Sequence, residues 1–154
     1  MKLLSDRRLV AALRIGLGAL FIAAALPKLQ DPAGFAGSID HYHLLPEAGG
    51  RILALVLPVL ELLVGMCLVL GVLDAGASLL VLALMIVFTA AVGSAVARGL
   101  DISCGCFDTE GGTKVGVTKV AENLALTAAA FWVRVRDRSW LSVGALLRKP
   151  GDVE

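Results

Sequence analysis

The stretch that decides the fold is Ala75–Ala97, AGASLLVLALMIVFTAAVGSAVA, which contains no charged residue. The hydrocarbon core of a bilayer is about 30 Å thick and takes about 20 helical residues. A run this long and this apolar therefore predicts a transmembrane helix. The other apolar residues of the chain gather into runs of similar length.

These further runs cover residues 9–29, 52–73 and 115–133, and their interruptions are single residues such as Pro58 and Glu61. Membrane helices tolerate proline and glycine because neighbouring groups satisfy the freed backbone atoms. We therefore expect one all-α domain over residues 1–154, an integral membrane four-helix bundle with spans 9–29, 52–73, 75–97 and 115–133. Residues 134–154 are expected to form a cytoplasmic basic tail.

The composition supports a membrane protein and argues against a partner bound through bulk charge. Hydrophobic residues make up 58% of the chain, whereas soluble domains average roughly 45–50%. The net charge is +1, so the chain lacks the excess of positive charge that binds nucleic acid. No glycine-rich phosphate loop is present either. The expected partner of this surface is the lipid bilayer, and nucleic acid is not expected.

Basic residues in short loops set the orientation of membrane helices. Eight basic residues precede the first run or follow the fourth, and at most five lie at the opposite ends of the runs. We therefore expect both termini in the cytoplasm of a bacterial inner membrane, loops 30–50 and 98–116 on the periplasmic side, and a tight inner turn at 74–76. The chain start resembles a signal peptide, but the apolar run continues to Leu29, which favours a retained helix.

Cys104 and Cys106 lie in the second outer loop, between the third and fourth spans, and only Gly105 separates them. A disulfide needs Cα atoms about 4.4–6.8 Å apart, and Gly105 widens the choice of backbone shapes that meet this distance. So small a ring is strained, and strained exposed disulfides exchange readily. The pair favours thiol–disulfide exchange, in which either cysteine is the attacking thiol. Metal ligation and inert loop cysteines are the alternatives.

The metal alternative draws on His41 and His43 in the first outer loop. Together with Cys104 and Cys106 they would supply a tetrahedral Cys2His2 set, although the spacing matches no familiar zinc signature. The third cysteine, Cys67, lies deep in the second apolar run and is expected to be a small buried hydrophobe.

Arg14, Glu61, Lys119 and Glu122 are ionisable residues inside the apolar runs. An unpaired charge at membrane depth is costly, so such residues are functional candidates. One interpretation is internal pairing, with Glu61 held by Arg14 or Lys119. The other is a proton-accepting site beside a quinone, because electron transfer between a dithiol and a quinone also moves two protons.

Three segments carry a family resemblance. They are Lys28-Leu-Gln-Asp31-Pro32 with Phe35 and Leu44-Leu45-Pro46, Leu57-Pro58-Val-Leu-Glu61-Leu with Gly65, and Arg98-Gly-Leu-Asp101-Ile-Ser-Cys104-Gly-Cys106-Phe107. In these segments the chain resembles the MauE branch of the DoxX-like membrane proteins, over roughly residues 10–133. The resemblance implies a membrane protein that helps to mature a disulfide-rich periplasmic dehydrogenase subunit together with a thioredoxin-like partner.

The function predicted from the sequence is thiol–disulfide exchange through Cys104 and Cys106 on the periplasmic side of the inner membrane. The expected partner is a periplasmic thioredoxin-fold protein, and a quinone is the candidate electron acceptor. A metal-binding membrane protein and a non-catalytic helper or subunit of a DoxX-like oxidoreductase are the alternative functions.

Overall fold

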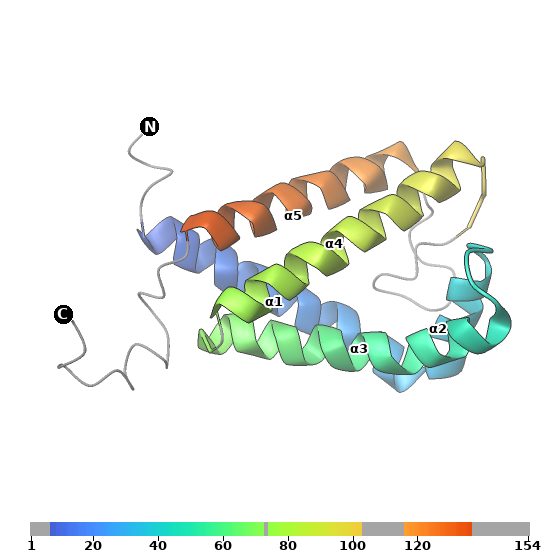
Figure 1. Cartoon of the computed structure of the whole chain (residues 1–154), viewed down its shortest axis with the longest axis horizontal. Coiled ribbons are helices and arrows are strands. Elements are labelled where there is room, and N and C mark those ends of the chain that lie inside the picture. The colour runs from blue at the N-terminus through green and yellow to red at the C-terminus, as the bar shows by residue number, and fades with distance from the viewer. Residues whose placement is uncertain (1–6, 73, 103–115, 137–154) are drawn as a thin grey trace.

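The computed structural model describes residues 7–72, 74–102 and 116–136, and all the regular structure in these ranges is helical. The helices are α1 (Arg7–Gln30), α2 (Pro32–Asp40), α3 (Glu47–Leu70), α4 (Asp74–Ala97) and α5 (Val117–Arg136) (Figure 1). The prediction of an all-α fold is confirmed. The described part of the chain contains five helices, because the short α2 adds to the four long helices expected from the sequence.

The long helices form two antiparallel pairs. Helix α1 packs along α3, and α4 packs along α5, while the α3–α4 connection joins the two pairs (Figure 1). Helix α1 begins and α5 ends at the same end of the bundle. At the opposite end, here called the α2 end, lie α2, the last turn of α4 and the first turn of α5.

Helices α1 and α3 approach each other closely at Gly18 and Gly65. A Cβ atom built on Gly18 would lie 2.7 Å from the carbonyl oxygen of Gly65, and one built on Gly65 would lie 2.8 Å from that of Gly18. Small residues permit such an approach between membrane helices, where dispersion contacts between backbones stabilise the pair. This crossing fixes how α1 and α3 face each other.

Helix α2 occupies part of the segment that the sequence suggested was a loop, residues 30–50. Asp31 caps its N-terminus, because the Asp31 side chain accepts a hydrogen bond of 2.9 Å from the backbone N–H of Gly34. Pro32 follows at the first helical position, where its missing N–H costs nothing. The side chain of Phe35 is buried and packs against Ala54 and Leu57 of α3, so α2 closes the α2 end of the bundle.

The turn between α3 and α4 lies earlier in the chain than predicted. Helix α3 ends at Leu70 because Gly71 takes the left-handed conformation, with φ 65°, and a side chain there would be strained. The backbone N–H of Val72 then donates to the carbonyl of Cys67. Residues 74–76, expected to form the turn, instead begin α4.

Three of the described helices are long and apolar enough to cross a membrane: Arg8–Gln30, Glu47–Leu70 and Gly76–Ala97. Their outward faces carry large apolar side chains, of which Ile52, Leu55 and Val87 are all more than 60% exposed. Such faces suit lipid rather than water. The chain is thus a multi-pass membrane protein. Helix α5, with charged residues at both ends, is not among the three candidate spans.

Candidate functional site

The centre of the candidate site is a buried ion pair between α1 and α3. The Nζ atom of Lys28 donates to both carboxylate oxygens of Glu61, at 2.7 and 2.8 Å. Lys28 and Glu61 are only 1% and 2% exposed. Both residues belong to helices long enough to span a membrane, and their burial places the pair in the protein interior.

The direction of helical side chains explains why these two residues meet. Side chains on a helix lean toward its N-terminus. Because α1 and α3 are antiparallel (Figure 1), Lys28 leans into the bundle from the α2 end and Glu61 leans back toward that end. The two charged groups therefore converge between their Cα positions.

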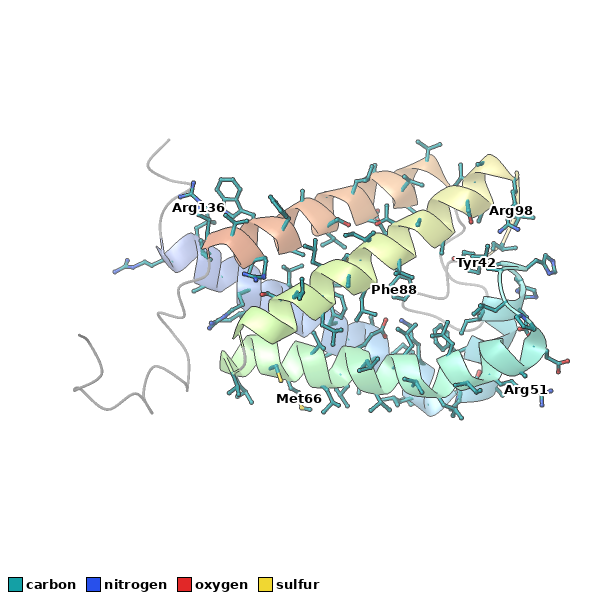
Figure 2. The ribbon with its side chains drawn as sticks, in the orientation of Figure 1. Tyr42, Arg51, Met66, Phe88, Arg98 and Arg136 are labelled. Atoms are coloured by element: carbon teal, nitrogen blue, oxygen red, sulfur yellow. The ribbon has the colours of Figure 1, made fainter. Side chains whose placement is uncertain are left out.

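Two aromatic rings complete the surroundings of the ammonium group. Lys28 Nζ lies 5.0 Å from the centroid of the Phe35 ring on α2 and 5.1 Å from that of Phe88 on α4. Phe88 projects from α4 toward the α1–α3 pair (Figure 2). A cation over an aromatic face is stabilised by the ring quadrupole, by about 2 kcal/mol where it is desolvated. Groups from three other helices thus surround the Lys28 ammonium: Glu61 of α3, Phe35 of α2 and Phe88 of α4.

The partner of Glu61 differs from the sequence prediction. Internal pairing is confirmed, but the partner is Lys28, and the prediction of Arg14 or Lys119 was wrong. Arg14 is buried, yet it lies fourteen residues before Lys28 on α1, about 21 Å away at 1.5 Å per residue. The sequence carried the missed signal, since Lys28 lies inside the first apolar run and not in the loop after it.

Lys119 and Glu122 form a separate pair on the first turns of α5. Lys119 Nζ lies 2.6 Å from Glu122 Oε2, and the Glu122 side chain is 52% exposed. Exposed pairs of this kind contribute at most about 1 kcal/mol. The four ionisable candidates therefore do not form one cluster, because only Glu61 lies at the buried site.

Sequence reasoning missed Asn123 of α5. Its side chain is buried, and it lines a pocket with Lys28 and Glu61. The pocket has a volume of about 40 Å³, and its remaining wall is apolar: Leu20, Phe21, Ala24, Met85, Phe88 and Leu126. The sequence did indicate that Asn123 could face the interior, because it lies one turn after Lys119 in the polar first half of an otherwise apolar run.

The loop after α2 and the end of α4 are connected at the α2 end. Arg98 Nη2 donates to the backbone carbonyl of Tyr42 at 2.6 Å, and Figure 2 shows both residues at this end of the molecule. Burial raises the pKa of the Tyr42 phenol above its ordinary value of 10.0. The chain therefore leaves α4 toward Cys104 beside the loop that carries His41 and His43.

His41 and His43 are both exposed. Among the described residues, no three His, Cys, Asp or Glu side chains gather in a way that would hold a metal ion. Cys104 and Cys106 lie outside the described residues, so the Cys2His2 alternative and the disulfide remain predictions. Cys67 is partly buried and packs against the apolar core, which agrees with a structural role.

Comparison with known proteins identifies the family. The family model described as methylamine utilisation protein MauE matches residues 6–136. The chain belongs to the MauE family. Among curated MauE proteins, that of Paracoccus denitrificans is 43% identical over 120 residues, 77% of this chain and 64% of the relative. That of Methylorubrum extorquens is 39% identical over 132 residues, 85% of this chain and 71% of the relative.

The resemblance drawn from the three sequence segments is thus confirmed. This MauE-family chain spans somewhat less than two thirds of the length of the Paracoccus denitrificans relative. No solved structure matches the chain.

Proposed function

We propose that this chain takes part in methylamine utilisation as a membrane thiol–disulfide exchange protein that acts through Cys104 and Cys106. The family name supports the process, since the curated relatives are named methylamine utilization proteins. The observation that carries the chemistry is the Cys-Gly-Cys sequence in the connection between α4 and α5. Two thiols separated by one residue in such a connection suit exchange better than stapling, because the loop they close is too short to stabilise much.

The exchange is a balanced sequence of bond changes. One thiolate of the reduced pair attacks the disulfide of a thioredoxin-fold partner, which forms a mixed disulfide and releases one partner thiolate. The second cysteine then attacks the mixed disulfide, which forms the Cys104–Cys106 disulfide and releases the reduced partner. The steps run in reverse when the pair begins oxidised.

A membrane quinone is the proposed electron acceptor for the pair when it is reduced. A dithiol that becomes a disulfide releases two electrons and two protons, and a quinone that becomes a quinol takes up the same number. The bilayer supplies quinones directly to a multi-pass membrane protein. This step would return the pair to its oxidised state for another exchange.

The proposed orientation places the α2 end on the periplasmic side, with α5 as a fourth crossing helix and both termini in the cytoplasm. Lys28 is one of the five basic residues counted at the opposite ends of the apolar runs, but it is buried in α1 and does not lie in an outer loop. Without Lys28 in the count, basic residues are in larger excess at the other end of the bundle, where Arg134 and Arg136 lie in the last turn of α5. A larger excess supports this orientation.

The test is acid-trapped thiol alkylation in intact cells, with a mass tag that counts free cysteines before and after a pulse of reductant or oxidant. We expect Cys104 and Cys106 to change together while Cys67, packed in the apolar core, stays constant as an internal reference. The variants Cys104→Ser and Cys106→Ser should each trap a mixed disulfide with the partner. Cysteines that stay reduced under oxidant would contradict the proposal, and bound metal that is lost on changing His41 or His43 would favour the Cys2His2 alternative.

A further inference from the structure

The pocket beside the Lys28–Glu61 pair contains a polar group that no described residue satisfies. The Nδ2 atom of Asn123 is buried and has no hydrogen-bond partner within the described part of the chain. The residue is 8% exposed and lines the pocket. An amide nitrogen carries two donors, and leaving them unpaired away from water costs several kcal/mol at membrane depth. We therefore expect a hydrogen-bond acceptor for this amide inside the pocket.

The volume of the pocket limits the size of the molecule that can supply this acceptor. One buried water needs about 10–15 Å³ of the space open to its centre, whereas a cavity that binds benzene has about 150 Å³. A pocket of about 40 Å³ holds about three waters and is too small for a six-membered ring. Water is thus the occupant that fits.

The wall of the pocket also supplies the polar contacts that buried water needs, which are two to four for each molecule. Lys28 donates two of its three protons to Glu61, and the carboxylate of Glu61 has further lone pairs. With Asn123, these two side chains offer both donors and acceptors. The walls from α4 and α5 contribute no charged residue, so Lys28 and Glu61 are the only titratable groups among the described residues that line the pocket.

We propose that this pocket is a hydrated proton-exchange site inside the bundle. Water held by Asn123 Nδ2 contacts the Lys28–Glu61 pair. An excess proton carried by this water passes to a Glu61 oxygen, which leaves neutral water and gives a neutral carboxylic acid beside the Lys28 ammonium, and the reverse step returns the proton to the water. No electrons move, so the site needs no oxidant or reductant.

The place of the pocket along the bundle follows from the positions of its residues on α4 and α5. Asn123 lies six residues into α5, about 9 Å from its first residue, and Phe88 lies nine residues before the end of α4, about 13 Å. The pocket is therefore nearer the α2 end than the opposite end of these helices. This proposal does not depend on disulfide exchange, because the hydration, quinone-analogue and infrared experiments described below measure water contact and proton uptake directly.

Hydration can be tested on the unmodified chain, because Asn123 is the only asparagine of the sequence and Gln30 the only glutamine. The full chain, labelled with 15N at one of these residue types, is reconstituted in lipid bilayers for solid-state NMR with transfer of magnetisation from water. We expect the Asn123 side-chain amide to receive magnetisation from water and to exchange in D2O, as the exposed Gln30 amide does. An Asn123 amide as protected as backbone amides of the helix interior would overturn the proposal.

A quinone analogue provides the competing outcome. The analogue is added to the same bilayers, and the Asn123 signal is recorded again. We expect the water contact to persist. If the analogue shifts the Asn123 resonance and abolishes the water contact, a quinone carbonyl occupies the pocket and the assignment to water is overturned.

Proton exchange itself is tested by infrared spectroscopy of the Glu61 carboxylic acid band after a pH jump, with Glu61→Gln to identify the band. We expect Asn123→Leu to slow proton uptake about fivefold, the effect of one lost hydrogen bond of about 1 kcal/mol to the buried water. Thr118→Val is the matched control, because Thr118 lies on the same helix, is exposed and is outside the pocket wall. Equal rates in Asn123→Leu and the unmodified chain would refute the role of Asn123.

Discussion

Replacing Lys28 by methionine is the sharpest test of the buried ion pair. The change keeps an unbranched side chain but leaves the Glu61 carboxylate without the cation that it contacts at 2.7 and 2.8 Å. Breaking a buried pair by removing one partner costs about 3–5 kcal/mol, because the remaining charge is buried and uncompensated. The Phe35 and Phe88 rings also lose their cation. We therefore expect the free energy of unfolding to fall by about 3–5 kcal/mol.

The assay is equilibrium unfolding of the purified chain in mixed micelles, followed by circular dichroism as denaturing detergent is added. The matched control is Arg51→Ala on α3, which removes the salt bridge to Glu47. Both side chains of that pair are about 70% exposed, so we expect a loss of about 0.5 kcal/mol or less. Similar losses for Lys28→Met and Arg51→Ala would refute the argument that burial makes the Lys28–Glu61 pair important for stability.

Three further predictions concern the α1–α3 contact, the cap of α2 and the phenol of Tyr42. Gly18→Ala should reduce the free energy of unfolding by about 1–3 kcal/mol, because its Cβ would meet the α3 backbone. The control Gly16→Ala has open space around it and should change this free energy by less than about 0.5 kcal/mol. Equal effects of the two variants in detergent unfolding would contradict the close contact between α1 and α3. Asp31→Ala should reduce the free energy of unfolding by about 1 kcal/mol, because it removes the side-chain cap of α2. Asp31→Ser, which can still cap the helix, should keep most of this free energy in the same assay. Tyr42 is the only tyrosine, so an ultraviolet titration reports the ionisation of its phenol alone. Because burial raises the pKa of this phenol in the folded chain, its contribution to the free energy of unfolding is fully present below about pH 10 and is lost as pH rises through the folded pKa. Ionisation at the ordinary pKa would contradict a buried phenol.

The membrane spans were predictable because a single property, apolar length, decides them. The residues of α4 show this most clearly, since Ala75–Ala97 was expected from the sequence and α4 covers Asp74–Ala97. Helix α2 was also within reach, because Asp31 followed by Pro32 is a common helix start. We expected a loop there since the segment is too short to cross a bilayer.

The ion pair was not predictable from the same property. Which charge meets Glu61 depends on the Gly18–Gly65 crossing of α1 and α3 and on the lean of Lys28 along its helix. Neither is visible in hydropathy, which places Lys28 inside the first apolar run but does not show which charge it meets. The role of Asn123 was hidden for a similar reason, because only the packing of four helices makes its pocket.

The double variant Lys28→Met with Glu61→Leu separates stability from function. Replacing a buried ion pair by apolar residues of similar volume is often neutral or stabilising, and the α1–α3 contact at Gly18 and Gly65 does not involve either charge. We therefore expect the double variant to unfold within about 1 kcal/mol of the unmodified chain. If the pair serves proton exchange, recovery of the Cys104–Cys106 oxidation state after a reductant pulse should nevertheless slow. A double variant that is stable and recovers at the ordinary rate would show that proton exchange at this pair is not coupled to oxidation of Cys104 and Cys106, because a proton-transfer group required for that oxidation cannot be removed without changing its rate.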